Sequence, residues 1–234
     1  MTIALPAAKL PIRFALEFLL DGRTPMRALS DEMIFAGAEE LSKHFSEMLE
    51  LGSGGSYYKD MLNGIIPLQT SNIVSGCDQT LDMTNLALPD GSRGLLMSAF
   101  AIEHFFEVEK SFSEAARVLR DGGVYFLIAP FLYYYHAAPD DYFRFTNSAL
   151  RALAEKHGLE VESEVALGDR WLMMSEFMHE KAVLGSRHGT IARLGFRLAA
   201  LPMLLISILR GKSDPRFAMG FAVALRKRAS GATP

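Results

Sequence analysis

The chain has 234 residues, a length that suits one large domain and is marginal for two. Half of the residues are hydrophobic and 22% are charged, which excludes a disordered chain, a collagen-like fibre and a highly charged nucleic-acid-binding tail. The single cysteine, Cys77, excludes a disulfide framework and a multi-cysteine metal site. We therefore expect one domain in a cytoplasmic, reducing compartment, and no metal site.

The charge is distributed unevenly along the chain. Residues 1–180 hold 14 basic and 26 acidic residues, whereas residues 181–234 hold 10 basic residues and a single acid, Asp214. The longest uncharged apolar run, Leu198 to Leu209, has 12 residues, and a membrane-spanning helix needs roughly 20. The N-terminus lacks the order of charge, apolar segment and cleavage site of a signal peptide. We expect no membrane span and no signal peptide, and a basic last quarter attached to an acidic body.

Residues 1–44 are predicted to form a helical cap on a later core. Two apolar faces recur at helical spacing and are separated by the turn residues 21–25. The first face consists of Ile12, Ala15, Leu16 and Leu19 and is widened by Phe14 and Phe18; the second consists of Met33, Ile34, Ala38 and Leu41.

Short apolar runs then alternate with helical patterns. Strands are predicted over residues 45–51, 67–74, 94–98, 124–129, 159–165 and 217–225, and helices over residues 109–120, 147–157 and 171–210. The run 124–129 is apolar throughout, as in a strand that is buried on both faces. The alternation predicts an α/β fold with a parallel sheet covered on both faces.

A glycine-rich turn follows the first predicted strand. Glu50 precedes Gly52-Ser53-Gly54-Gly55, and glycines at the carboxyl end of a first strand let a nucleotide-like ligand approach the backbone. The dinucleotide motif needs a third glycine where Tyr57 stands, and no Gly-Lys-Ser/Thr follows for a phosphate loop. A plain strand-ending turn is the alternative.

The spacing Glu50-x-Gly52-x-Gly54 resembles the first motif of class I S-adenosylmethionine-dependent methyltransferases (methyltransferase type 11-like), with Ser56 in place of the third glycine. Three further segments follow in the order that the family has. Asp82 to Pro89 resembles D-A-x-x-L-P-F with two extra residues, Ser98 to Phe105 resembles S-x-x-x-x-E-H, and Ala115 to Gly123 resembles A-x-R-V-L-K-P-G-G. The resemblance covers residues 45–165 and returns at 215–228.

This resemblance implies a Rossmann-like, doubly wound sheet of seven strands whose last strand is antiparallel. The core would span residues 45–170, a helical insertion 171–214 and the last strand 215–228, all in one methyltransferase domain. It also implies S-adenosylmethionine as the cofactor, with an acid, here Asp82, on the adenine amino group. The residues expected to line the cofactor are Glu50, Gly52, Ser53, Gly54, Asn72, Asp82, Met83 and Ser98.

Asn72 departs from the family pattern. The family ends its second strand with an acid that takes both ribose hydroxyls, and an amide loses that charge-assisted bond. From the sequence we predict that Asn72→Asp tightens cofactor binding. Asn72 and Ser56 also support an alternative, a catalytically weak or inactive methyltransferase-fold binding protein. A nicotinamide-dependent oxidoreductase is disfavoured by Tyr57 at the third-glycine position.

The segment Pro130 to Thr146 combines four tyrosines, a histidine, two acids and an arginine. It resembles an H-x-x-P-x-D-Y-x-R-F/Y-T element in a subset of these methyltransferases that is linked to sugar or envelope metabolism. We expect His136 to act as a base, oriented by Asp141 or Asp140, and we expect Tyr142 and Arg144 to bind substrate. The competing interpretation is that Asp141 and Arg144 pair only to brace the loop.

The expected acceptor is a small molecule or a lipid- or sugar-linked group. Nucleic acid is not an expected partner, because residues 98–101 are unlike the N/D-P-P-Y/F motif of the branches that methylate bases. His104 is expected to be structural.

The basic last quarter leaves two alternatives open. Helices over 171–210 could close over the sheet or form a homodimer interface. Alternatively, residues 187–216 could lie in a membrane interface, with arginines near anionic headgroups, so that the protein is peripheral at the inner face of the membrane.

Overall fold

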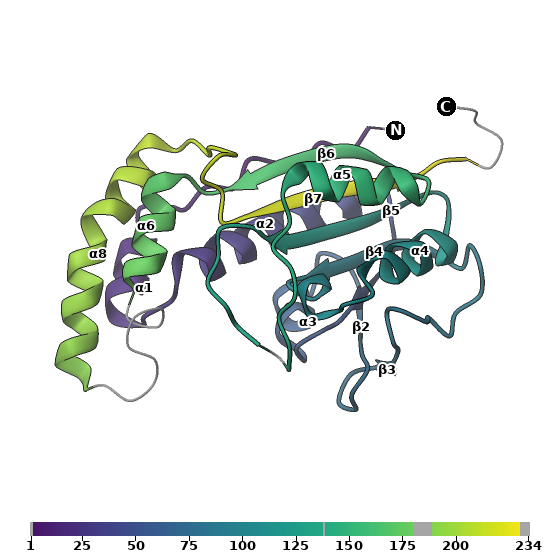
Figure 1. The fold of residues 1–234 in the computed structure, drawn as a ribbon, viewed down its shortest axis with the longest axis horizontal. Coiled ribbons are helices and arrows are strands. Elements are labelled where there is room, and N and C mark those ends of the chain that lie inside the picture. Colours follow the sequence, from purple (N-terminus) through teal and green to yellow (C-terminus); the bar gives the residue numbers. More distant parts are fainter. Residues whose placement is uncertain (1, 138, 180–188, 230–234) are drawn as a thin grey trace.

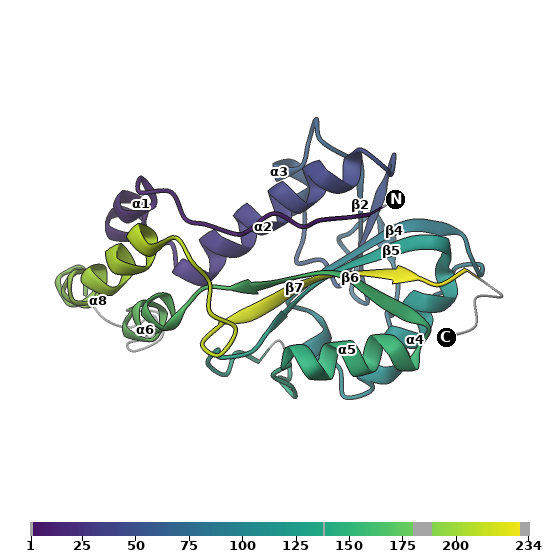
Figure 2. The ribbon, with the colours of Figure 1, turned by 90° about the horizontal axis from the view of Figure 1, so that it is seen from above.

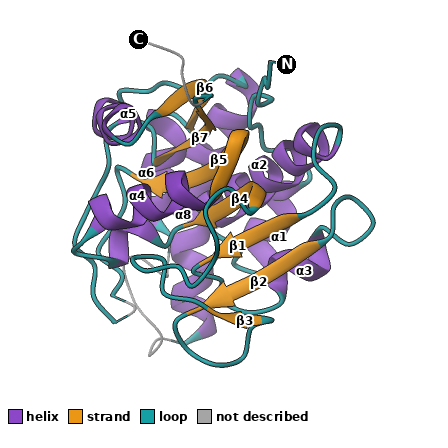
Figure 3. Cartoon of the chain, turned by 90° about the vertical axis from the view of Figure 1, so that its right-hand side faces the viewer, coloured by secondary structure: helices purple, strands orange, loops and turns teal. Residues whose placement is uncertain are grey.

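The computed structural model describes residues 2–137, 139–179 and 189–229. Its centre is a seven-stranded sheet in the order β3-β2-β1-β4-β5-β7-β6, in which β7 runs antiparallel to β5 and β6 (Figures 1 and 3). The strands are β1 Met48–Leu51, β2 Leu68–Asn72, β3 Gln79–Thr80, β4 Arg93–Ala99, β5 Leu119–Pro130, β6 Leu159–Leu167 and β7 Gly220–Lys227. The predicted doubly wound sheet with an antiparallel last strand is confirmed.

Helices cover both faces of the sheet. They are α1 Phe14–Leu20, α2 Pro25–Ser42, α3 Tyr57–Met61, the short 3-10 helix η1 Ile102–His104, α4 Val108–Val118, α5 Asn147–Lys156, α6 Arg170–Met178 and α8 Thr190–Arg210. Figure 2 shows α2 and α3 on one face and α4 and α5 on the other, while α1, α6 and α8 gather at one end of the molecule.

The central strand β5 shows why this sequence forms such a layered fold. Successive side chains of a strand point to opposite faces, so an apolar run serves two cores at once. Val124, Phe126 and Ile128 belong to the core under α2, whereas Tyr125, Leu127 and Ala129 belong to the core under α4 and α5.

Several element boundaries differ from the prediction. β1 begins at Met48 rather than at residue 45, and β7 begins at Gly220 rather than at residue 217. The two-residue edge strand β3 was not predicted, because two residues carry no periodicity. The segment 121–123, predicted to end a helix, instead lies within β5, because Leu119 already pairs with Arg93 across an irregularity in β4.

The N-terminal cap is helical only from Phe14, since residues 2–10 contain no helix. The backbone N–H of Leu5 donates to Ser163 Oγ at 3.0 Å, which ties this segment to β6. The predicted apolar face around α1 is confirmed in part: Phe14 and Phe18 are buried and Leu19 packs against the core, whereas Ile12 and Leu16 are exposed. The larger apolar area of the two rings explains this, because burying it removes more apolar surface from water.

The insertion contains a longer helix than the uncharged run suggested. α8 has 21 residues and is, among the described residues, the one helix long and apolar enough to cross a membrane by length and composition, with 17% of its apolar window buried. This finding revises the expectation that no segment has the length to span. The sequence count stopped at Arg197, but the helix continues through it. Part of the predicted contact segment, including Arg187, lies outside the described residues.

Candidate active site

A cavity of about 580 Å³ lies at the carboxyl ends of β1, β2 and β4. This size is within the range of small-molecule sites, and the edge is where open α/β sheets bind ligands. The cavity brings together five of the predicted cofactor residues, namely Glu50, Gly52, Ser53, Gly54 and Asn72.

The turn after β1 is shaped by close packing at Gly52. Gly52 has a φ of 75°, and a Cβ built on it would stand 2.5 Å from the Cβ of Ala101. The neighbouring residue Ser53 is fixed by its N–H, which donates to Ser71 O at 2.8 Å, and by its hydroxyl, which donates to Gly55 O at 2.8 Å. At Gly52 the turn therefore borders the cavity with its backbone and without a side chain.

Asn72 closes this turn from the end of β2. Its Nδ2 donates to Ser53 O at 2.6 Å, and it lines the cavity beside Ile73. A carboxylate could not replace the Asn72 amide in this hydrogen bond, because an ionised carboxylate has no proton to donate to the Ser53 carbonyl oxygen.

This hydrogen bond reverses the effect predicted from the sequence for Asn72→Asp. We now expect the substitution to weaken S-adenosylmethionine binding by about tenfold, because it sets a negative charge against the Ser53 carbonyl and loosens the turn. Calorimetric titration of the variant against the wild type measures the change. Asn63→Asp, which adds the same charge at an exposed position outside the cavity, is the control. Tighter S-adenosylmethionine binding by Asn72→Asp would instead support the prediction from the sequence, in which residue 72 binds the ribose hydroxyls of the cofactor.

Glu50 borders the same cavity as an almost fully buried carboxyl, and its Oε2 has no hydrogen-bond partner. Burial raises the pKa of Glu50 to about 7, against the smaller opposing influences of Ser53 and the Arg27 guanidinium. The group therefore changes its charge near neutral pH.

The cap contributes to the cavity wall, which the sequence did not predict. Arg27 of α2 lines the cavity, and its guanidinium lies 4.1 Å from the centre of the Tyr57 ring. The buried Asp31 accepts the Tyr57 hydroxyl at 2.7 Å and lies 3.3 Å from Arg27 Nε. Contacts between α2 and α3 therefore hold the Arg27 guanidinium at the cavity, and no local sequence motif predicts these contacts.

The other predicted cofactor residues do not line this cavity. The Asp82 carboxylate accepts the N–H and the hydroxyl of Thr84, at 2.8 and 2.7 Å, and so closes a turn. Met83 is buried behind Gly52, and Ser98 is buried within β4. The two extra residues after Asp82 are part of the reason, since they form the turn that occupies its carboxylate.

Phe100, at the end of β4, was also missed. It lines the cavity with a φ of 52°, the left-handed region that side-chain-bearing residues rarely adopt. Its N–H donates to Ile128 O at 3.0 Å, which holds the strained backbone in place. Such strain gathers at functional sites when the surrounding structure imposes it.

Arg144 braces the loop that follows β5. Its guanidinium donates to Asp141 Oδ2 at 2.6 Å and to the carbonyl oxygens of Tyr134 and Phe143 at 2.7 and 2.8 Å. This guanidinium lowers the pKa of Asp141 to about 2. The structure therefore contains the Asp141–Arg144 pair that the competing interpretation expected to brace the loop. Tyr142 is 47% exposed, and its ring packs against Phe106.

The braced loop brings His136 next to η1. His136 Nε2 lies 3.6 Å from Glu103 Oε1, and His104 Nε2 lies 3.9 Å from the same oxygen. The pKa of His136 is raised, chiefly by the Glu103 carboxylate. His104, expected to be structural, lines the cavity, whereas His136 and Asp141 do not. The adjacent Glu103 and His104 of the S-x-x-x-x-E-H segment are the sequence feature from which the position of His104 at the cavity could have been predicted.

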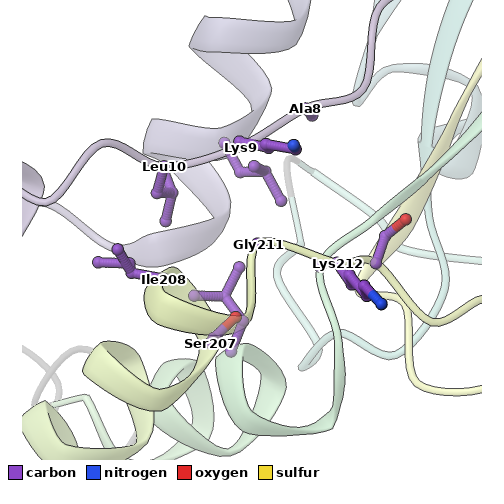
Figure 4. Close-up of a pocket in the computed structure, with 11 residues that line it drawn as sticks. Ala8, Lys9, Leu10, Ser207, Ile208, Gly211 and Lys212 are labelled. Atoms are coloured by element: carbon purple, nitrogen blue, oxygen red, sulfur yellow. The ribbon is translucent and has the colours of Figure 1, made fainter.

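A second cavity, of about 90 Å³, lies between the N-terminal segment and the end of α8, and Figure 4 shows Lys9 and Lys212 beside it. It is too small for a cofactor and lies away from the glycine turn, so it does not compete as the site.

Comparisons with known proteins agree with this geometry. Residues 49–127 match the profile of a family described as methyltransferase domain. A provisionally named sarcosine dimethylglycine methyltransferase from Galdieria sulphuraria is 16% identical; the match covers 95% of this chain and 93% of that one, with a TM-score of 0.60. For the cyclase SpnF the identity is 14%, the coverages are 97% and 99%, and the TM-score is 0.61. No curated protein sequence gives a significant match.

These TM-scores and coverages show the shared fold, whereas the profile match falls on the segments that build the glycine turn, β4 and most of β5. The cavity fits the cofactor of that family, because Gly52 and Gly54 line it with backbone alone and leave room for a close approach. The profile match over residues 49–127 and the fold together support a class I S-adenosylmethionine-dependent methyltransferase, and they imply S-adenosylmethionine as the cofactor.

Proposed function

We propose that the protein transfers a methyl group from S-adenosylmethionine to a small-molecule or lipid- or sugar-linked acceptor. The observation that carries the proposal is the cavity in which the Gly52 turn, Asn72 and Glu50 converge. Bound S-adenosylmethionine supplies a sulfonium methyl that is already activated, so the protein mainly needs to position the acceptor. Arg27, which lines the same cavity, suits the cofactor carboxylate.

The acceptor would approach along His104, Phe105 and Pro139, which line the cavity beyond the glycine turn. A base is needed only if the nucleophile carries a proton, as a hydroxyl does. His136 is our proposed base, and Glu103, rather than Asp141, is the carboxylate that its Nε2 faces. Tyr142 and Arg144 then act on the acceptor side by holding the loop.

His136→Ala is expected to lower turnover by about 100-fold or more while leaving S-adenosylmethionine affinity within about twofold, because His136 does not line the cavity. A screen with a methyl-labelled cofactor identifies the acceptor, and the variant is then compared with wild type on it. His44→Ala, at an exposed position of the cap, is the control. Full turnover by His136→Ala would remove it as the base.

A non-catalytic binding protein is the second candidate function. The structurally similar protein SpnF is named as a cyclase and not as a methyltransferase. Release of S-adenosylhomocysteine that depends on an acceptor from the screen would eliminate this candidate, whereas cofactor binding without release for every acceptor class would favour it.

We further propose that one surface of the protein lies on a membrane. The α1–α8 surface consists of exposed apolar residues on and next to two neighbouring helices: Ile12 in the turn before α1, Leu16 and Leu20 on α1, and Ile191, Leu194, Leu198, Ile206 and Leu209 on α8. Arg197 of α8 donates to Leu19 O at 2.8 Å, which joins the helices, and Figures 1 and 2 show both at the same end of the molecule. Ile191 is 90% and Leu209 79% exposed.

The charges beside the α1–α8 surface favour an anionic membrane as its partner. Lys9, Arg13, Lys212 and Arg216 are exposed near the helix ends, and basic residues are attracted to anionic headgroups. Since α8 packs Ala200, Leu204 and Ser207 inward, we place it along the interface rather than across the membrane.

Vesicle flotation tests this placement. The wild type should float with phosphatidylcholine vesicles that contain phosphatidylglycerol, and less with phosphatidylcholine alone. Leu16→Glu/Leu198→Glu should lower the bound fraction by about tenfold, because it places two charges in the apolar layer. Val74→Glu, at an exposed apolar position near the cavity end, is the control. No flotation with either vesicle would remove the membrane as the partner, and a solution dimer that only the double variant disrupts would assign the surface to a second copy.

A further inference from the structure

The cluster of Glu103, His104 and His136 has an unusual arrangement of polar atoms. One potential ligand atom from each of these residues lies within 4.8 Å of the others. Glu103 is fully buried, and neither of its carboxylate oxygens accepts a hydrogen bond. A buried carboxylate without such a partner is costly, so a charged species is expected to complete it.

The Nδ1 atoms of both histidines face backbone carbonyl oxygens. His104 Nδ1 lies 2.5 Å from Asp140 O, and His136 Nδ1 lies 3.2 Å from Tyr134 O. A carbonyl oxygen only accepts, so these contacts put the proton on Nδ1. Two further groups lie near His136 Nδ1. Asp141 Oδ2, at 3.5 Å, accepts a hydrogen bond and favours the proton on Nδ1, which outweighs the opposing guanidinium nitrogen of Arg144, a donor at 3.3 Å.

With Nδ1 protonated, a neutral histidine presents its Nε2 lone pair. When both histidines are in this neutral form, their Nε2 lone pairs face Glu103 Oε1, and a cation would take the position that a proton on Nε2 otherwise occupies. A backbone carbonyl on Nδ1 is the outer contact that orients metal-binding histidines. The separations of 3.6 and 3.9 Å are slightly above the roughly 3.4 Å that two ligands reach around a four-coordinate ion.

We propose that Glu103, His104 and His136 bind one divalent transition-metal cation of the Zn²⁺ or Fe²⁺ class. Two imidazoles and one carboxylate form a ligand set used by such ions, whereas Mg²⁺ and Ca²⁺ prefer oxygen ligands. Both histidines are partly exposed, so an ion can reach them from solvent. The sequence did not predict the site, because the loop brings His136 to η1 from far along the chain.

The position of the cluster gives such an ion a role. His104 lines the large cavity, so the ion would border the space proposed for the acceptor. There it would favour an acceptor oxygen in its deprotonated form. With the ion bound, His136 is a ligand, so the role of base proposed above applies to the protein without the ion. The binding itself does not depend on methyl transfer.

Metal binding to the untagged, chelator-treated protein tests the proposal directly. Titration with Zn²⁺, and separately with Co²⁺ and Mg²⁺, should give one Zn²⁺ or Co²⁺ per chain and no Mg²⁺ at the same concentration. Glu103→Gln and His104→Gln should each weaken Zn²⁺ binding by more than about 100-fold, because each removes a ligand. His44→Gln, at an exposed histidine outside the cluster, should leave the affinity unchanged.

Thermal unfolding supplies a readout that does not require activity. Zn²⁺ should raise the Tm of the wild type and of His44→Gln, and leave that of His104→Gln unchanged. If the buried Glu103→Gln variant does not fold, the partly exposed His104→Gln carries the test. No bound Zn²⁺ in the wild type, equal binding by His104→Gln, or a preference for Mg²⁺ would each overturn the proposal.

Discussion

Gly52→Ala is expected to abolish measurable S-adenosylmethionine binding and to lower the free energy of unfolding by about 3 kcal/mol. Alanine at a φ of 75° costs about 1–2 kcal/mol in the left-handed region. In addition, its methyl group would stand 2.5 Å from the Cβ of Ala101, so the turn or the end of β4 must move. Either movement deforms the cavity floor. Calorimetric titration and urea unfolding measure the two effects.

Gly64→Ala separates the two causes. Gly64 has a φ of 86°, but nothing lies within 4 Å of the Cβ that it would gain, and it does not line the large cavity. We expect it to lose only the backbone contribution, about 1–2 kcal/mol, and to bind cofactor normally. Wild-type affinity in a folded Gly52→Ala protein would show that the turn does not contact the cofactor.

The Gly52 turn could be predicted from the sequence because its information is local. The spacing of Glu50, Gly52 and Gly54 after an apolar run specifies a strand, a tight turn and a close backbone approach within a few residues. The alternation of strands and helices likewise fixed the sheet class, since each periodic segment reports which face it buries.

Contacts between distant elements could not be predicted in this way. Arg27 reaches the cavity only because α2 packs beside α3, and His136 reaches Glu103 only because Arg144 folds the loop back. Part of the predicted face around α1 was misassigned for the same reason. Periodicity placed Ile12 and Leu16 on the same apolar face as Phe14 and Phe18, but only the two rings are buried in the core.

The buried carboxyl of Glu50 should make cofactor binding depend on pH. In the empty site its pKa is about 7, so below pH 7 the carboxyl is mostly neutral. A bound sulfonium cation favours the ionised form, so binding releases a proton and strengthens as the pH rises. S-adenosylmethionine affinity is expected to increase by about tenfold between pH 6 and pH 8, and Glu50→Gln should flatten this dependence.

The stability of the empty protein should change in the opposite direction. A folded-state pKa above the ordinary value means that the native protein holds this proton more tightly than the unfolded chain. The contribution of Glu50 to stability is therefore complete below about pH 4.5, falls as the pH rises towards 7, and levels off above it. The loss amounts to about 3 kcal/mol.

Urea unfolding of the wild type and Glu50→Gln at pH 5 and pH 8 measures this term. The neutral amide lacks the titration, so the stability of Glu50→Gln relative to wild type should increase by about 2.5 kcal/mol between the two pH values, slightly less than the full loss because part of it already occurs below pH 5. Glu39→Gln, at an exposed position of α2, should show no such change. A pH-independent difference for Glu50→Gln would mean that the carboxyl titrates in its ordinary range, and the pH dependence of cofactor affinity would then require another group.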